Sequence, residues 1–225
     1  MADKQKKNRK KGGFLTAAGI LLLLGALGLT SYNIWDGLRA RHESLAIEEQ
    51  IAARMPETIV EARDPLAMEE TDLSMPVFEI DGYSYVGVIE IPSLKISLPV
   101  MDTWDDSRLR IAACRYWGNY KTDDMVICAH NYIQFFAPIR GIGMGADVYF
   151  ISAGGTAYHY QVTNRETLRP TAVEEMVTNT VQGTDGKEVR DWDLTLFTCF
   201  PGGQTRCAVR CVRVMEEDQA QEAGT

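Results

Sequence analysis

A cysteine and an arginine lie at adjoining ends of two short runs in the last third of the chain. The first run, 194–199, reads as a strand that ends on Cys199, and residues 200–204 form a turn containing proline and glycine. The second run begins at Thr205 and Arg206. So short a connection predicts an antiparallel hairpin, which brings Cys199 and Arg206 to the same rim of a sheet. A thiol beside a guanidinium favours the thiolate and is placed to act as a nucleophile.

A second arginine in the same strand competes for this role. Arg210 shares the face of Arg206 by the period of two, but it lies about 13 Å deeper at the usual rise per residue. Arg206 is therefore the better partner for the thiol, and Arg210 is expected to tolerate lysine. The opposite face carries Cys207 and Cys211, which we expect to be small buried hydrophobes.

A histidine follows another apolar run. Residues 125–129 read as a buried strand that delivers His130 at its carboxyl end. A histidine at the mouth of a barrel is placed to exchange protons. A structural histidine is the alternative that this segment alone leaves open. His42 falls in a predicted stalk and His159 in the middle of a predicted strand, so neither competes well with His130.

Charge and cysteine spacing exclude other classes of site. The chain of 225 residues carries a net charge of −8, although its first eleven residues hold six lysines and arginines against one aspartate, so the remainder is strongly acidic. An acidic body argues against nucleic-acid binding, because phosphates need a basic face. The five cysteines lack the spacing of tetrahedral zinc sites, so no metal is expected.

The N-terminal part predicts a membrane anchor. Residues 12–35 contain no charged side chain. About 20 apolar residues suffice to cross a bilayer. The basic segment 1–11 precedes this run, so the positive-inside rule predicts a cytoplasmic N-terminus and an extracellular body. A cleaved signal peptide is the alternative. The length of the run and the lack of a clear cleavage site favour an uncleaved, single-pass helix at the cell membrane.

The rest of the chain predicts one mostly β domain. Residues 36–80 are expected to form a juxtamembrane helix and a linker, 81–214 the compact domain, and 215–225 a polar tail. Many short strands suggest an antiparallel barrel or sandwich. The expected strands are 83–91, 94–101, 125–129, 148–152, 157–163, 194–199 and 205–214, with helical pieces at 107–114 and 172–178.

Three separated motifs together resemble the sortase family. Thr195-Leu196-Phe197-Thr198-Cys199 resembles the sortase signature strand, and the strand opening with Arg206 resembles the one that supplies the sortase arginine. Val126-Ile127-Cys128-Ala129-His130-Asn131 is similar to the histidine strand, with Ala129 in place of the usual glycine. A fourth segment, 85–92, resembles the opening barrel strand. The resemblance covers about 83–214 in the family's order.

The resemblance implies an eight-stranded β-barrel with short helices, no cofactor and a cysteine transpeptidase activity. Cys199 would attack an LPxTG-like sorting signal of a surface or pilin protein and hold a thioacyl intermediate. An amine such as a peptidoglycan precursor would then resolve it. His130 would protonate the leaving amine, and Arg206 would stabilise the oxyanion. Thr198 is a further candidate for substrate binding, although its hydroxyl is expected to point away from the Cys199 face.

Several alternatives stay open. Asp64-Pro65-Leu66 resembles the Asp-Pro-aromatic lid of pilin-polymerising sortases but lacks the aromatic residue. Such enzymes often carry a C-terminal membrane helix, and its absence here favours wall anchoring over pilus assembly. A hydrolytic cysteine protease could use the same three residues with water as acceptor. A membrane-tethered binding module without catalysis is the third possibility, in which Cys199 is only a strand residue.

Overall fold

The computed structural model describes residues 2–62, 72–184 and 186–215. Its first element is the helix α1 (Ala2–Ala52), and the chain divides into two compact units, Met1–Arg39 and Ala40–Thr225. The predicted lid motif Asp64-Pro65-Leu66 and most of the predicted tail lie outside the described residues.

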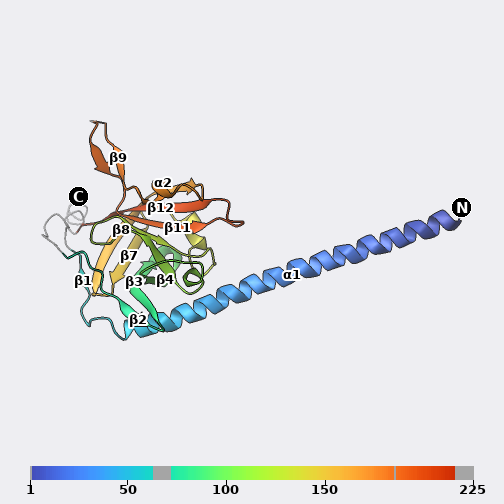
Figure 1. Cartoon of the computed structure of the whole chain (residues 1–225), viewed down its shortest axis with the longest axis horizontal. Coiled ribbons are helices and arrows are strands. Elements are labelled where there is room, and N and C mark those ends of the chain that lie inside the picture. The colour runs from blue at the N-terminus through green and yellow to red at the C-terminus, as the bar shows by residue number, and fades with distance from the viewer. Residues whose placement is uncertain (1, 63–71, 185, 216–225) are drawn as a thin grey trace. The chain divides into compact units, whose positions relative to one another are not determined.

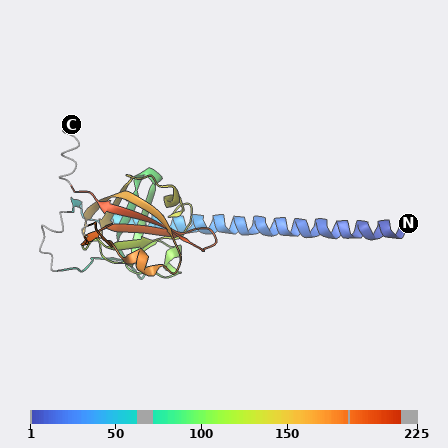
Figure 2. The ribbon, with the colours of Figure 1, turned by 90° about the horizontal axis from the view of Figure 1, so that it is seen from above.

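Within the described part of the second unit, eight strands close into a barrel (Figures 1 and 2). This confirms the predicted mostly β, eight-stranded fold. Around the barrel, each strand is bonded to the next, and the last closes on the first, in the order β8 (Thr156–Leu168), β12 (Arg206–Arg213), β11 (Leu194–Cys199), β6 (Met125–Cys128), β5 (Ala113–Trp117), β4 (Ile96–Met101), β3 (Tyr83–Ile91) and β7 (Asp147–Ser152). Two neighbouring pairs, β4 with β5 and β6 with β11, run parallel.

Several short strands and helices lie outside the eight strands of the barrel. Two short strands extend it at β1 (Val60–Glu61) and β2 (Phe78–Ile80), and β9 (Thr180–Gln182) pairs with β10 (Glu188–Arg190) in a separate hairpin. Short helices occur at η2 (Pro92–Leu94), η3 (Arg108–Arg110), η4 (Ala137–Gly141) and α2 (Val173–Val177). Figure 1 shows the hairpin of β9 projecting away from the barrel.

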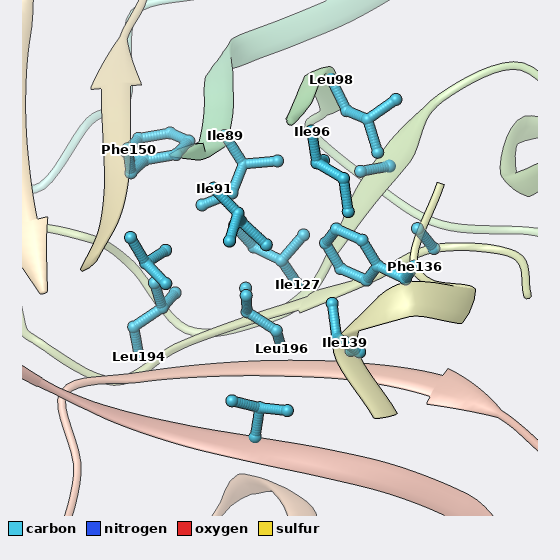
Figure 3. Close-up of a cluster of buried hydrophobic side chains, with 14 of the residues drawn as sticks. Ile89, Ile91, Ile96, Leu98, Ile127, Phe136, Ile139, Phe150, Leu194 and Leu196 are labelled. Carbon is cyan, nitrogen blue, oxygen red and sulfur yellow. The ribbon is translucent and has the colours of Figure 1, made fainter. Parts of the chain in front are cut away.

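The core lies inside the barrel, and the strands bury alternate side chains there. Leu194 and Leu196 pack in the interior cluster, whereas Phe197 packs in clusters on the other face of the sheet. Figure 3 shows interior side chains from β3, β4, β6, β7, β11, η4 and the residue before η4 converging: Ile89, Ile91, Ile96, Leu98, Ile127, Phe136, Ile139, Phe150, Leu194 and Leu196. The outer faces are covered as well, so β6 is buried along its whole length. A strand buried on both faces reads as a continuous apolar run, as 125–129 does.

The compact unit begins well before the predicted start near residue 81. Ala40, Ile47 and Ile51 on α1 are buried, and the two isoleucines pack in the cluster outside the barrel. Arg41 donates a hydrogen bond of 2.9 Å to the carbonyl of Ser97 on β4. The last part of α1 is therefore part of the domain, and the predicted membrane and juxtamembrane helices are one continuous helix.

Two predicted elements differ from the structure. Of the predicted helical piece 107–114, only η3 is helical, and Ala113 already begins β5. Cys114 pairs there with Cys128 on β6, a long-range contact that a local pattern does not contain. Strand β8 continues past residue 163 to Leu168, because its pairing with β12 continues that far. The second helical piece is confirmed as α2.

Candidate active site

The hairpin of β11 and β12 places Cys199 beside Arg206. The two residues are direct partners across the strands, as the sequence predicted. The loop closes through a hydrogen bond of 3.0 Å from the amide of Phe200 to the carbonyl of Thr205. Gly203 takes a positive φ of 71°, which glycine adopts at little cost. Figures 1 and 2 both show this loop extending beyond the rest of the sheet.

The parallel pairing of β6 with β11 brings His130 to the same rim. Phe197 is the partner of Cys128, and the amide of Ala129 donates to the carbonyl of Phe197 at 3.3 Å. Continuing this register places His130 alongside Cys199, on neighbouring strands about 4.8 Å apart. Two parallel strands thus deliver the thiol and the imidazole from segments about 70 residues apart in the sequence.

Thr198 lies on the opposite face of β11 and is buried. Its hydroxyl donates a hydrogen bond of 2.9 Å to the carbonyl of Ala129, immediately before His130. The hydroxyl therefore ties the ends of the two strands together. The substrate-binding role suggested for Thr198 stays a prediction.

The ring of His130 is held by the two residues that follow it. The amide of Asn131 donates to Nδ1 at 3.0 Å, so a neutral ring carries its proton on Nε2. The side-chain oxygen of Asn131 lies 3.1 Å from Nδ1 and can accept a hydrogen bond from Nδ1 when the ring is protonated. Tyr132 stacks on the ring at 4.3 Å between centroids and packs edge-on against buried Phe135. Sequence reasoning assigned no role to Asn131 or Tyr132, although their adjacency to His130 was a usable signal.

The guanidinium of Arg206 supports the hairpin loop. Its Nη1 donates to the carbonyls of Gly203 and Thr205 at 2.9 and 3.4 Å. Within the described part of the chain, Nε and Nη2 donate to no protein group. These N–H groups are available to a negative charge that develops beside Cys199.

Arg210 has a different environment and is a structural residue. Its side chain is 3% exposed and binds Glu166 at 2.6 Å and the hydroxyl of Thr195 at 2.8 Å. It also donates to the carbonyls of Glu175 and Met176 in α2, at 2.6 and 3.0 Å. These contacts argue against the expectation that Arg210 tolerates lysine, because one guanidinium joins three segments.

Four of the five cysteines are buried, and Cys199 is partly exposed. Burial raises the pKa of the Cys114 thiol to about 12 and raises the pKa values of Cys128, Cys207 and Cys211 above the usual thiol range. These four thiols are inert packing groups at neutral pH. The prediction that Cys207 and Cys211 are buried hydrophobes is confirmed.

A cavity of about 320 Å³ joins the candidate residues, with Cys199, His130, Arg206 and Thr198 in its lining. Phe197 and Cys128 also line it, and both pack in clusters outside the barrel interior. The site therefore lies on the outer face of the strands, whereas the sequence suggested the barrel mouth. The other lining residues come from β5, from the segments 104–110 and 169–176, and from the position after β6: Trp104, Asp106, Leu109, Arg110, Tyr116, Ala129, Arg169, Pro170, Ala172, Val173 and Met176.

The described residues contain no group of three or more histidine, cysteine, aspartate or glutamate side chains that could hold a metal ion. His159 pairs with Asp147 at 2.8 Å and stacks on Tyr149. It takes no part in the cavity. The chemistry that this arrangement can support is that of a thiol, an imidazole and a guanidinium.

Comparison with known proteins identifies the family and the fold of the chain. A family model described as the sortase domain matches residues 89–214. The crystal structure of sortase C from Streptococcus pneumoniae is 20% identical, with a TM-score of 0.50 over 80% of this chain and 88% of that one. Sortase C from Clostridium perfringens, solved with the C-terminal cell wall sorting motif, is 23% identical, with a TM-score of 0.48 over 64% and 78%. At these identities the likeness concerns the fold alone. A search of curated proteins gave no match.

Proposed function

The chain belongs to the sortase family of cysteine transpeptidases, and on that premise we propose that Cys199, His130 and Arg206 are its catalytic residues. The family match covers more than half of the chain. The observation that carries the proposal is that one cavity is lined by all three side chains, which come from two strand ends and the start of a third.

The first half-reaction uses the thiol and the imidazole. The proton of Cys199 passes to His130, and the thiolate attacks the carbonyl carbon of the scissile peptide bond. The imidazolium then returns the proton to the nitrogen of the leaving peptide, and the carbon–nitrogen bond breaks. A thioester on Cys199 remains. Asn131 can bond both states of the ring. Its backbone N–H donates a hydrogen bond to neutral Nδ1, and its side-chain oxygen can accept one from protonated Nδ1.

The second half-reaction transfers the acyl group. An incoming amine gives a proton to His130 and attacks the thioester, and the thiolate of Cys199 leaves as the new amide bond forms. The unpaired N–H groups of Arg206 would bind the oxyanion in both tetrahedral intermediates. Because Nη1 of Arg206 is already held by loop carbonyls, the guanidinium is oriented before the substrate binds.

Sortases act on proteins that carry a sorting signal, and the finer assignment of substrates is a proposal. We assign this chain an LPxTG-like signal on surface or pilin proteins, with an amine such as a peptidoglycan precursor as acceptor. Sortase C from Streptococcus pneumoniae has specificity for pilin substrates, which is a property of that enzyme. Wall anchoring and pilin linking use the same chemistry and differ in the molecule that supplies the amine, a peptidoglycan precursor or another pilin.

Sortases are membrane-associated, and α1 contains a stretch that could serve as the anchor. The helix Gly13–Ala52 is long enough to cross a membrane and contains an 18-residue window that is apolar enough to do so. We propose that its basic N-terminal side faces the cytoplasm and that the barrel is extracellular. Protease treatment of intact, wall-stripped cells tests this orientation, and protection of the barrel would contradict it.

A peptide assay tests the proposed function. Full-length protein in detergent micelles is incubated with a fluorogenic Leu-Pro-Glu-Thr-Gly peptide, with and without triglycine, and intact-mass analysis follows the thioester. We expect an adduct on Cys199 and a triglycine-linked product that Cys207→Ala retains. If the leaving peptide is released equally with and without triglycine and no triglycine-linked product forms, the result would favour a hydrolytic protease. Failure of a thiol reagent to label Cys199 would favour a binding module.

A further inference from the structure

Arginines flank the proposed catalytic residues along one rim of the barrel. Strands β8, β12, β11, β6 and β5 are consecutive neighbours. Leu168 at the end of β8 is the partner of Arg206, so Arg169 follows directly at this rim. On the other side, β5 runs antiparallel to β6, and the segment before Ala113 lies near the end that carries His130. Arg110 belongs to that segment and lines the cavity.

Arg110 is the arginine of this rim that is most available to a ligand. Its side chain is exposed, and within the described residues it makes no hydrogen bond, ion pair or ring contact. Arg169 already lies 4.0 Å from Glu175, and Arg206 holds the hairpin loop. Asp106 also lines the cavity but forms no ion pair with Arg110 among the described residues.

The cavity combines this charge with an aromatic wall. Trp104 lies 5.3 Å from Tyr116, and Tyr116 lies 5.1 Å from Phe197, between ring centroids. Trp104 is still 45% exposed and can take more apolar contact. Apolar neighbours lower the local dielectric, so a charge pair formed here is stronger than one in open water. The planar guanidinium of arginine is suited to hold both oxygens of a carboxylate.

The charge of the lining contrasts with that of the whole protein. Three arginines and one aspartate line the cavity, whereas the chain has a net charge of −8. A peptide lying across the rim from β8 to β5 passes five neighbouring strands. The distance from the first of these strands to the last is about 19 Å at the usual strand spacing. That span corresponds to about six extended residues. A side chain of a bound sorting signal can therefore reach Arg110 while the scissile bond lies at Cys199.

We propose that this cavity selects sorting signals that carry an aspartate or glutamate, through an ion pair with Arg110. The inference rests on the proposed function and deepens it by naming the chemistry of the substrate. Arg110 acts as a specificity residue and takes no part in bond making or breaking.

A peptide library tests the selection. Full-length enzyme in detergent micelles is incubated with nonapeptides that carry Thr-Gly at two fixed positions near the middle and equimolar mixtures of amino acids at the other seven positions. Hydroxylamine is the acceptor, because it lacks a carboxylate. Mass spectrometry of the products yields the ratio of acidic to amide side chains at each position. We expect aspartate and glutamate to exceed asparagine and glutamine about tenfold at one position, the factor expected for about 1.4 kcal/mol.

Matched variants identify the residue responsible. Arg110→Gln should reduce the ratio to about one, Arg110→Glu should select lysine instead, and Asp106→Asn should raise the ratio. Lys187→Gln, which removes a charge near the β9–β10 hairpin, should keep the wild-type ratio. Because each ratio compares peptides cleaved by the same enzyme, it does not depend on the folded fraction.

Two outcomes contradict the inference in different ways. If the library is cleaved without an acidic preference, or if Arg110→Gln keeps that preference, the role of Arg110 is overturned and the proposed function stands. If the wild-type enzyme leaves the whole library intact, the proposed function is overturned, and this inference with it.

Discussion

Arg210→Lys should weaken the fold and loosen one wall of the cavity. The guanidinium of Arg210 contacts Glu166 on β8, Thr195 on β11 and two backbone carbonyls of α2, at 2.6 to 3.0 Å. It also lies 5.0 Å from the ring of Trp192. An ammonium has three donors on one atom and cannot reach acceptors on three segments at once.

The magnitude follows from burial. A hydrogen bond to a charged group contributes about 1.5–3 kcal/mol, but such values do not add within one network. Removing one partner of a buried ion pair costs about 3–5 kcal/mol, which we expect for Arg210→Ala. Glu166 is 35% exposed and can be rehydrated, so the lower end applies. Lysine keeps the charge and part of the bonding, so Arg210→Lys should cost about half as much.

The functional effect should appear in KM. Val173 and Met176 of α2 line the cavity, and Arg210 holds the carbonyl of Met176. A loosened α2 should weaken substrate binding, whereas among the described residues Arg210 forms no hydrogen bond or ion pair with the proposed catalytic residues. We expect KM to rise several-fold with a smaller change in kcat. Urea unfolding of the fragment 40–225, followed by circular dichroism, and turnover of the fluorogenic peptide measure the two effects.

Arg165→Lys is the matched control for this substitution. Arg165 is exposed on β8 and makes a hydrogen bond of 3.1 Å to the carbonyl of Ile142. Its replacement should change stability by less than about 0.5 kcal/mol. If Arg210→Lys has the urea midpoint and the KM of the wild type, Arg210 does not hold α2, and the argument from its contacts is refuted.

Further changes have defined outcomes. Cys199→Ala should abolish the transfer reaction with the fold intact, whereas Cys207→Ala should keep activity in its folded fraction and lower the urea midpoint. Arg206→Ala should lower kcat about 10²–10³-fold, the cost of losing one oxyanion donor, and lysine at this position should recover little. The fragment 81–225 should have a lower urea midpoint than 40–225 and a free energy of unfolding smaller by several kcal/mol, because each buried isoleucine of the missing helix contributes about 1.5–3 kcal/mol. Asp123→Asn should cost about 3–5 kcal/mol, because it removes a buried carboxylate that two arginines contact, and asparagine keeps the positive φ of 52°.

Each of these predictions has a result that would contradict it. An acyl adduct on Cys207 in mass spectrometry would mean that the nucleophile is misassigned. Full activity of the Arg206→Ala variant would exclude its guanidinium from the oxyanion site. Equal urea midpoints for the two fragments would show that α1 adds nothing to the domain, and an unchanged midpoint for Asp123→Asn would show that its ion pairs contribute no stability.

The sequence by itself determined the local part of the site. The turn at 200–204 and the period of two along a strand are properties of neighbouring residues, so they sufficed to pair Cys199 with Arg206. The bounds of β3 and β11 were predicted to the residue for the same reason. The apolar run before His130 likewise identified a buried strand that ends at a polar residue.

Only the tertiary structure decided which surfaces meet. A pattern shows that one face of a segment is apolar, but it does not contain the partner that covers this face. The burial of Ile47 and Ile51 against the barrel, the pairing that makes 113–117 a strand, and the position of the cavity on the outer face all depend on distant residues. Arg210 shows the limit most clearly. Its spacing from Arg206 suggested a tolerant position, and contacts with Glu166, Thr195 and α2, which lie between 15 and 44 residues away, make it a buried structural residue.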